Sequence, residues 1–346
     1  MDMELDPLLL SRIQFAFVVC FHAIFPVFTI GLASTIAGFE FLSFKTGNPI
    51  WQRLSKFWIQ VFAVVFGIGV VSGIVMSFQF GTNWSNFSYA TANFLGPVLS
   101  YEVVTAFFLE AAFLGVLLFG RDKVPQGVHL FAACMVALGT FISSFWILAA
   151  NSLMQTPQGL ELVNGIYHVS SWSEALFTPS FGYRFLHMAL ASFLTAALVV
   201  AGVSAWFLLK NREFEANRKA LSIALWFLLF LAPAQALVGD FHGINTLKYQ
   251  PMKVAAMEGN WETQKGVPLL LFAIPDKEEQ TNHFEVKIPK LASFILTHDW
   301  DGEVPGLKEV SKEEQPPVFI VFWSFRIMVA LGFLMIGFAL WGLILR

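Results

Sequence analysis

Charged residues are scarce in this sequence and make up only 13% of its 346 residues, whereas soluble globular chains carry about 25%. The formal net charge of −3 gives no sign of the basic surface that nucleic-acid binding requires, and no nucleic-acid partner is expected. With 56% hydrophobic residues, the composition excludes an ordinary soluble domain and indicates a polytopic membrane protein.

Cysteine is scarce too, which excludes several kinds of site. Cys20 and Cys134 both lie in apolar stretches, so neither a disulfide framework nor the spacing of a zinc site is available. No CxxCH motif occurs, so any haem must be held non-covalently. The N-terminal stretch MDMELDPLLLSR lacks the basic region of a signal peptide, so we expect the first apolar stretch to stay in the mature protein.

Seven apolar stretches are long enough to cross a bilayer, which takes about 20 helical residues. We therefore predict an all-α fold, a polytopic membrane helical bundle of about seven transmembrane helices with one long extramembrane loop. Residues 1–240 hold the first six helices, residues 241–317 the loop and residues 318–346 the last helix. The predicted helices are Gln14–Phe41, Phe57–Phe80, Pro97–Gly120, Val128–Met154, Tyr183–Leu209, Ala220–Val238 and Val318–Leu345.

Basic residues divide the connections between these helices into two groups. Lysine and arginine follow the first, third and fifth predicted helices, whereas the connections near residues 82–93 and 155–180 have none. Positive residues stay on the cytoplasmic side of a membrane. The N-terminus and the long loop are therefore expected outside, and Arg346 inside.

Two carboxylates occupy the third apolar stretch. The spacing of Glu102 and Glu110 places them about 80° apart around an α-helix and about 12 Å apart along it. A charged side chain at mid-bilayer costs about 2.5–3.5 kcal/mol. Two such carboxylates on one side of a helix therefore favour a functional role. The alternative is that the acids are protonated and form hydrogen bonds between helices. The pattern suits a ligand or proton acceptor at one depth and a proton relay at another.

Four other residues are unusual for membrane helices and lie towards the outer side. His22 and His187 lie at similar depth, and Arg326 and Met328 lie about two to three turns into the last helix. A lone histidine in a membrane helix is more often a hydrogen-bonding residue than a ligand. Two histidines without a cysteine cluster indicate haem, and a methionine partner raises the reduction potential of a haem. Arg326 and Met328 face about 200° apart, so one can ligate iron while the other meets a propionate.

Several motifs follow one another along nearly the whole chain. They are SRIQFAF with His22, FQFGTNW, YEVVTAFFLE with Glu102 and Glu110, FWILAANSLMQTP, YRFLH with His187, GVSAWFLLK, GDFHG, KVAAMEGNWET with Lys253 and Glu258, and FRIMVALGF with Arg326 and Met328. On these residues the chain resembles subunit I of cytochrome bd-type quinol oxidases. Its short loop, with GDFHGINTLKYQPMKVAAMEG, is similar to the branch called cyanide-insensitive oxidases.

The resemblance implies which residues hold haem. His22 is expected to ligate one of two high-spin haems, either a b-type haem or haem d. His187 and Met328 are expected to hold a low-spin haem b. Arg326 is expected to stabilise the reduced form of that haem.

The resemblance also implies where quinol and protons are handled. Lys253 and Glu258 match positions implicated in quinol oxidation in the long loop, which this family calls the Q-loop. Glu258 is expected to accept a proton, and Lys253 to orient the headgroup. Glu102 matches an acid at the high-spin haems. Glu110 matches an acid on the proton route from the cytoplasm, with Ser143 expected beside it.

The function implied is that of a haem-containing subunit of a terminal quinol:oxygen oxidoreductase in the respiratory chain of a bacterial cytoplasmic (inner) membrane. Quinol is expected to be oxidised at the outer face, and oxygen to be reduced to water with cytoplasmic protons. The implied partners are a second membrane subunit, called subunit II, and small single-helix subunits, besides the lipid bilayer. A functional role is open to His242 and His283 in the loop, but both are expected to be solvated.

One departure from the family pattern keeps alternatives open. Family members continue past the last predicted helix to a GWxxxExGRQPW-like segment, whose acid takes part in high-spin haem ligation, and this chain stops at Arg346. We expect a fragment, a truncated product or a reduced homologue. The alternative function is a quinol-oxidising b-haem membrane cytochrome, or an inactive fragment without a complete oxygen site. A transporter fits the buried charges alone but explains neither Met328 nor the ordered motifs.

Overall fold

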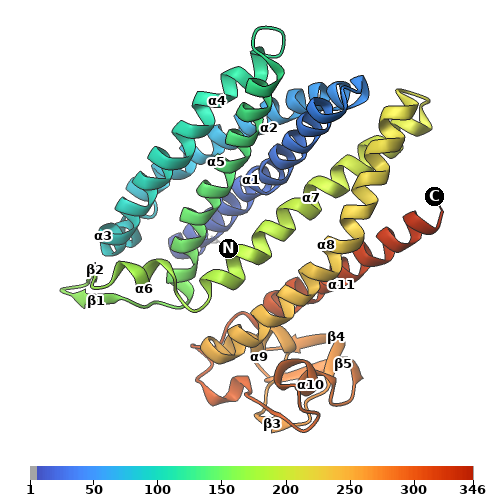
Figure 1. Ribbon diagram of the computed structural model, residues 1–346. Helices are drawn as coiled ribbons and strands as arrows, with labels where there is room; N and C mark the ends of the chain where they lie inside the picture. Colours follow the sequence, from blue (N-terminus) through green and yellow to red (C-terminus); the bar gives the residue numbers. More distant parts are fainter. Residues whose placement is uncertain (1–5, 346) are drawn as a thin grey trace, which may run out of the picture. The chain divides into compact units, whose positions relative to one another are not determined.

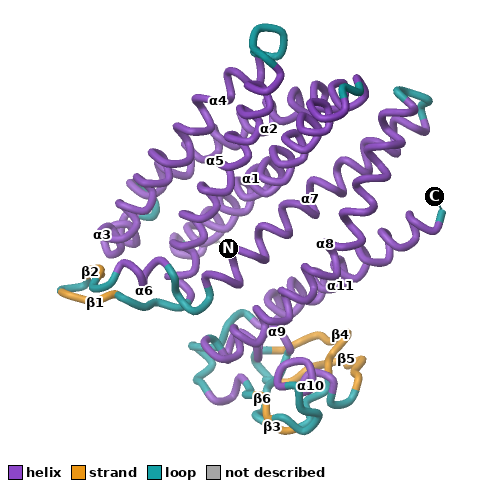
Figure 2. Tube along the Cα trace, in the orientation of Figure 1, coloured by secondary structure: helices purple, strands orange, loops and turns teal. Residues whose placement is uncertain are grey.

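The computed structural model describes residues 6–345 of the chain (Figures 1 and 2). The chain folds into two compact units. Unit 1 comprises residues 1–181 and 188–228, and unit 2 comprises residues 182–187 and 229–346. The predicted places of residues 1–5 and of Arg346 lie outside the described residues.

Seven helices in the described part of the chain are long and apolar enough to cross a membrane. The predicted all-α membrane bundle is thereby confirmed. Most of these helices run beyond their predicted bounds because the helical backbone continues into polar flanking residues. The spans are Pro7–Thr46, Pro49–Gly81, Ser85–Phe119, Gln126–Gln155, Trp172–Leu209, Phe214–Tyr249 and Val318–Ile344.

The first two helices, α1 (Pro7–Thr46) and α2 (Pro49–Gly81), are joined by a very short turn that the local sequence specifies. Gly47 has φ +64°, a left-handed conformation that glycine adopts without steric cost and that commonly ends helices. Asn48 then caps α2 through its side chain, and Pro49 fills the first helical position. α1 and α2 therefore pack side by side.

The sequence predicts a single helix over Pro97–Gly120, but the third span is not one regular helix. It consists of α3 (Ser85–Glu102), a single π-helical turn η1 (Val103–Phe107) and α4 (Phe108–Phe119). A π turn takes in an extra residue and is frequent at functional sites. This one lies between the two predicted acids.

The rest of unit 1 packs around α5 (Gln126–Gln155), which contacts α1, α3 and α4. Its core includes the fully buried side chains Ile36, Trp58, Phe62 and Val136. Between α5 and α7 the chain forms a small hairpin and one short helix. The hairpin consists of β1 (Leu160–Val163) and β2 (Ile166–Val169), and the short helix is α6 (Trp172–Leu176). Helix α7 (Phe181–Leu209) follows.

Helix α8 (Phe214–Tyr249), whose residues from 229 onward belong to unit 2, continues well past the predicted loop boundary at residue 241. Nothing in GDFHGINTLKY breaks a helix, and the proline that does so comes only at Pro251. His242 therefore lies in a helix, and its Nε2 is buried. The expectation of a solvated loop side chain is wrong for this residue.

The rest of the long loop is folded around a small apolar core of Val254, Val267, Ala292, Leu296 and Val304. Two antiparallel strand pairs form in it, β3 with β6 and β4 with β5, which the sequence analysis did not predict. The apolar run VPLLLFAIP contains all of β4 except its last residue, Asp276. The elements are α9 (Pro251–Glu258), β3 (Gln264–Lys265), β4 (Leu269–Asp276), β5 (Thr281–Ile288), α10 (Leu291–Thr297), β6 (Glu303–Val304) and the 3-10 turn η2 (Leu307–Glu309).

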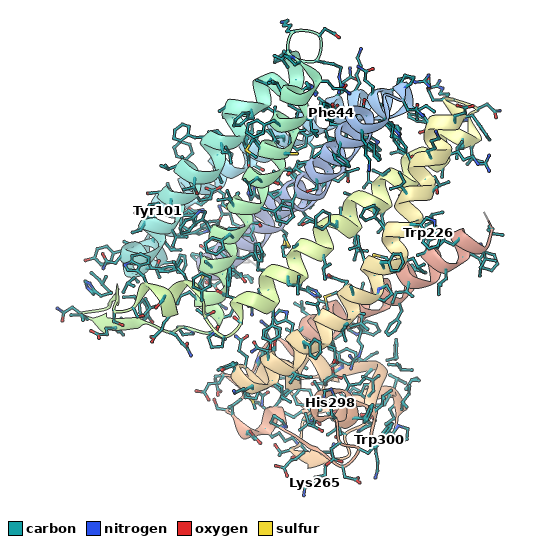
Figure 3. The ribbon with its side chains drawn as sticks, viewed as in Figure 1. Phe44, Tyr101, Trp226, Lys265, His298 and Trp300 are labelled. Atoms are coloured by element: carbon teal, nitrogen blue, oxygen red, sulfur yellow. The ribbon has the colours of Figure 1, made fainter. Side chains whose placement is uncertain are left out.

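The outer surfaces of the long helices are apolar. Phe44, Tyr101 and Trp226 are large exposed side chains of unit 1 (Figure 3). In unit 2, α11 (Val318–Ile344) buries only three of its described residues, Val318, Phe322 and Ala339. Such surfaces suit lipid or another membrane helix.

Candidate functional site

His22 lies on α1 and faces α2. Its Nδ1 is 2.9 Å from Ser72 Oγ, and that hydroxyl donates its proton to Gly69 O at 2.9 Å. Ser72 can therefore only accept a hydrogen bond from the ring, so His22 carries its proton on Nδ1 and leaves a lone pair on Nε2. A metal-ligating histidine has this form, with the tautomer fixed by a hydrogen bond at the other nitrogen.

His187 lies near the start of α7 and contacts α8 within unit 2. The side-chain amide of Gln235 donates to His187 Nε2 at 3.0 Å, and the ring of His242 stands edge-on to it with centroids 6.0 Å apart. Four buried side-chain atoms of the described residues have no hydrogen-bond partner, and three are here: His187 Nδ1, Gln235 Oε1 and His242 Nε2. Native proteins rarely leave buried polar atoms unpaired, so this cluster is suited to a bound polar group.

The surroundings of His187 also fit a large anionic cofactor. Gly239 of α8 lies so close to the ring that an added Cβ would be 3.2 Å from His187 Cε1. Arg184 and Lys253 lie near enough to His242 to interact with it electrostatically. The positive charges of Arg184 and Lys253 lie beside the buried polar atoms that have no hydrogen-bond partner. Such a combination suits the binding of the carboxylate groups of a haem.

Arg326, expected beside a propionate, has a carboxylate of this chain as its partner. Its Nη2 donates to Glu258 Oε2 at 2.6 Å, and its Nε donates to Leu270 O at 2.5 Å. The rings of Phe322 and Phe325 flank the guanidinium group. Both charged side chains are largely buried, so each supplies the counter-charge that the other needs.

Met328 lies on the same helix but is 50% exposed, in contrast to the nearly buried Arg326. This agrees with the opposite orientations expected from their spacing. The residue is therefore exposed enough to contact a cofactor, and its pairing with His187 stays a prediction.

Lys253 and Glu258 share the short helix α9 but face different ways, because their spacing corresponds to about 140° beyond a full turn. Glu258 binds Arg326, whereas Lys253 Nζ lies 3.5 Å from Gln250 Oε1. Burial lowers the pKa of Lys253, and the charge of Arg184 lowers it further. The two predicted quinol residues thus have different neighbours.

Glu102 accepts a hydrogen bond from Ser143 Oγ of α5 at 2.8 Å. The expectation that Ser143 lies beside Glu110 is therefore wrong. Glu110, which is 6% exposed, packs against Gly139 instead, where an added Cβ would lie 2.5 Å from Glu110 Cγ. Gly139 is one helical turn before Ser143, and the later residue of α5 meets the earlier acid because the two helices run in opposite directions.

Both acids nevertheless face α5, as their predicted shared side requires. The π turn η1 takes in one extra residue between them. Their separation then acts as about seven α-helical residues, which is close to two full turns. The offset of about 80° expected for a regular helix is thereby reduced to roughly 20°.

One buried polar cluster in unit 1 was not predicted from the sequence. Glu40 of α1 accepts hydrogen bonds from Arg121 and Ser55, and its Oε2 lies 3.1 Å from His129 Nδ1. The other ring nitrogen of His129 lies 3.1 Å from Leu117 O. Glu40 stands in an apolar stretch just as Glu102 does, and that signal could have identified it.

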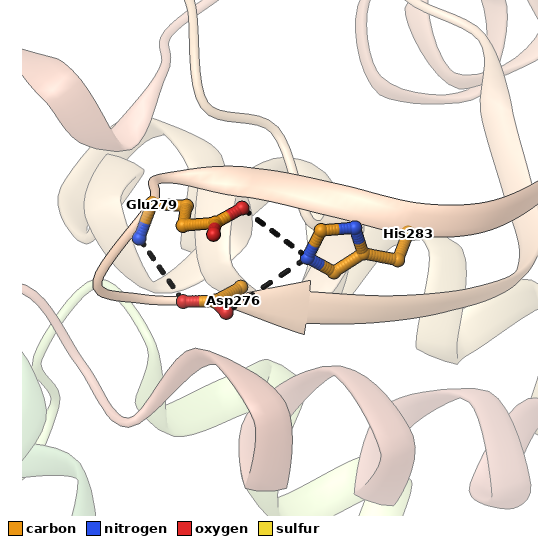
Figure 4. A group of neighbouring side chains, drawn as sticks. All are labelled: Asp276, Glu279 and His283. Carbon is orange, nitrogen blue, oxygen red and sulfur yellow. Dashed lines mark hydrogen bonds and ion pairs between the residues drawn. The ribbon is translucent and has the colours of Figure 1, made fainter.

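His283 lies near the turn between β4 and β5 (Figure 4), and its side chain is 43% exposed, as expected for a solvated histidine. Its Nε2 is 3.8 Å from Asp276 Oδ2 and 3.5 Å from Glu279 Oε2. The Asp276 carboxylate accepts the backbone N–H of Glu279 and of Glu278, and these hydrogen bonds lower its pKa. The three side chains could meet a metal ion, but they are exposed and already paired with one another, and we assign no metal site to them.

The family model described as cytochrome bd terminal oxidase subunit I matches residues 10–346 of the chain. The chain belongs to this family. It is 36% identical over 350 residues to cytochrome bd ubiquinol oxidase subunit 1 of Bacillus subtilis, covering 98% of this chain and 75% of the relative. It is 35% identical over 314 residues to cytochrome bd-II ubiquinol oxidase subunit 1 of Escherichia coli, covering 90% of this chain and 61% of the relative.

The bd oxidase structure from Geobacillus thermodenitrificans has the same fold, with a TM-score of 0.88 and 32% identity over 96% of this chain and 77% of that chain. Membership of the cytochrome bd subunit I family confirms the predicted haem-containing oxidoreductase subunit of respiratory electron transport. The family and the seven long apolar helices together also confirm that this chain is a membrane protein. Cytochrome bd subunit I normally works with a subunit II.

Proposed function

We propose that this cytochrome bd subunit I binds quinol at the Q-loop, holds a low-spin haem b at His187 and Met328, and holds a high-spin haem at His22. The high-spin group is a b-type haem or haem d. Bound haems would supply one-electron transfer and the iron that binds oxygen. The hydrogen bond from His22 to Ser72 is the main support, because it fixes the tautomer whose Nε2 can ligate iron.

At the quinol site, Lys253 and Glu258 have separate tasks. The Lys253 ammonium group donates a hydrogen bond to a quinol oxygen and orients the headgroup. Arg326 binds Glu258 Oε2, so Oε1 is the atom at which a quinol proton can be held. Arg326 then fixes the direction in which this carboxylate faces.

At the oxygen side, Glu110 and Glu102 handle the protons that oxygen reduction consumes. Glu110 is buried against α5 and holds a proton at its carboxyl group. Glu102, on the same side of the third span, is oriented by Ser143. Glu110 lies nearer to the basic connections than Glu102 does. A proton that enters from the cytoplasm would therefore reach Glu110 first and Glu102 second.

The sidedness of the membrane follows from the basic connections. Arg53 forms an ion pair with Glu213 at 3.1 Å, and Lys219 lies over the ring of Trp51 at 5.7 Å. The basic connections after the first and fifth spans therefore meet at one end of unit 1. The positive-inside rule assigns this end to the cytoplasm and the Q-loop to the outer face. Quinol protons are then released outside, and the protons for water are taken up inside.

Reduced-minus-oxidised absorbance spectra of the enzyme, purified with its partner subunits, test this assignment. We expect His187→Ala to remove the low-spin b bands. His22→Ala should remove a high-spin signal and oxygen consumption but retain the low-spin bands. His168→Ala, at an exposed position of the β1–β2 hairpin, is the matched control and should change neither.

Three outcomes would contradict this assignment. An unchanged spectrum in His22→Ala would exclude that residue as a ligand. Low-spin bands alone in the parent enzyme would favour a b-haem membrane cytochrome without an oxygen site. Absence of haem from the parent enzyme would remove the haem function altogether.

A further inference from the structure

The β4–β5 hairpin of the Q-loop contains two β-bulges. Ile274 pairs with His283 and Phe272 with Val286, so Ala273 alone faces two residues, Phe284 and Glu285. The next pair is Leu270 with Lys287, so Leu271 is an extra residue on the other strand. A bulge bends its strand and redirects side chains. Each strand thus carries one bulge.

Both bulges present large apolar side chains to the surroundings. Phe284 is 78% exposed and has φ +54°, and Leu271 is 50% exposed. An aromatic residue at positive φ is a genuine conformational outlier. Phe272, Val286 and Ile288 of the same hairpin are exposed as well. This concentration of apolar surface on a two-stranded element indicates contact with another molecule or with a membrane.

Contacts within unit 2 place this hairpin at the level where α11 enters the membrane. Leu270 and Ala273 pack against Phe322, and the ring of Phe272 stands edge-on to Trp323 with centroids 5.1 Å apart. Phe322 and Trp323 lie about 6–8 Å along α11 from its start. The described helix is about 40 Å long, whereas the hydrocarbon core is about 30 Å thick. β4 therefore lies near the boundary between headgroups and acyl chains.

We infer that the β4–β5 hairpin dips into the lipid leaflet in which α11 begins, with Phe284 and Leu271 as its membrane anchors. The neighbouring surface of α11 exposes Phe319 and Ile320, so the apolar surface of the hairpin continues a lipid-facing surface. Trp323, which contacts Phe272, is of a type favoured at this depth of a bilayer. The turn of the hairpin, with the charged side chains of Glu278 and Glu279, is expected to stay in water. None of this depends on where quinol binds.

Site-directed spin labelling of the complete oxidase in lipid nanodiscs tests the insertion. Cys20 and Cys134 are exposed and are first replaced by serine. A nitroxide is then attached in separate variants, Phe284→Cys and Leu271→Cys. Two reference positions bracket the result, Ile327→Cys on the exposed face of α11 for lipid and Glu279→Cys at the hairpin turn for water. Collisions with oxygen, which concentrates in lipid, are compared with collisions with a water-soluble nickel chelate.

We expect the oxygen-to-nickel collision ratio at Phe284 and Leu271 to be severalfold above that at Glu279 and close to that at Ile327. A ratio equal to that at Glu279 would place the hairpin in water and overturn the inference. Low collision rates with both reagents would show that a protein subunit covers the hairpin, which also overturns it. Haem absorbance verifies that each variant is assembled, and Val286→Cys replaces any variant that is not.

Discussion

At the scale of single residues, Lys253 gives a direct pH test of the quinol site. Burial and the charge of Arg184 lower its pKa, so its ammonium group loses its proton below the ordinary lysine value of about 10.4. We expect KM for quinol to rise as pH rises through this lowered pKa, because deprotonation removes the cation that orients the headgroup. The measurement is a pH profile of KM and kcat for the purified oxidase.

The conservative variant Lys253→Arg separates charge from packing. Arginine stays protonated at all accessible pH values, so the alkaline rise in KM should disappear. If the rise persists in Lys253→Arg, another group titrates and Lys253 does not orient quinol through its charge.

Ser143 offers a second test at this scale, because its hydroxyl group orients Glu102. Ser143→Ala removes a hydrogen bond with a net value of about 1 kcal/mol. We expect oxygen-reduction turnover to fall roughly fivefold and the infrared band of the Glu102 carboxyl group to shift. The low-spin haem bands should remain unchanged.

Ser144→Ala is the matched control, because the Ser144 hydroxyl bonds only to the backbone of its own helix, at Phe141 O. Equal losses in the two variants would mean that α5 is merely destabilised.

At the scale of elements, the π turn η1 sets the relative orientation of Glu102 and Glu110. Deleting Val104, an exposed residue within the turn, should convert the span to a regular α-helix in which about seven residues separate the acids, so that their offset stays at roughly 20°. Both acids can then still face α5. We expect the high-spin haem signal and oxygen reduction to be retained, together with the low-spin bands.

Val104→Ala keeps the residue count and should preserve both signals. Loss of the high-spin signal and of oxygen reduction in the deletion variant would contradict this account, because the π turn would then do more than absorb the extra residue between the acids.

At the scale of the whole molecule, the basic connections predict which side each loop faces. In intact cells, a membrane-impermeant maleimide should label Lys265→Cys in the Q-loop. It should label Asn211→Cys, between α7 and α8, only after permeabilisation. Both variants carry serine at Cys20 and Cys134. The reverse pattern would contradict the positive-inside assignment and move quinol oxidation to the cytoplasmic face.

The sequence predicted the helices well because their signal is local: an apolar stretch of sufficient length must become a helix in a bilayer. It also predicted that Glu102 and Glu110 share a side. It could not predict which residue of α5 meets which acid, because that depends on the packing of two helices. The partner of Ser143 was therefore wrong.

The same limit applies to charges that lie far apart in the sequence. Arg326 and Glu258 were recognised separately, but only the folded Q-loop brings them together. Glu40 of α1 and Arg121 of the turn after α4 form a contact although they lie 81 residues apart in the sequence. The strands of the Q-loop were missed because short apolar runs do not distinguish strand from helix.

The contact between Arg326 and the Q-loop has a consequence for the order of events during synthesis. Arg326 lies just over two turns into a membrane helix, and an arginine at the centre of such a helix costs about 2.5–3.5 kcal/mol to insert alone. Its two partners, Glu258 and Leu270, precede it in the chain and leave the ribosome first. A Q-loop that folds before α11 inserts can receive the guanidinium group at once, whereas one that folds late leaves it unpaired in the bilayer. We therefore expect the outer loop to fold before the last span is stably integrated.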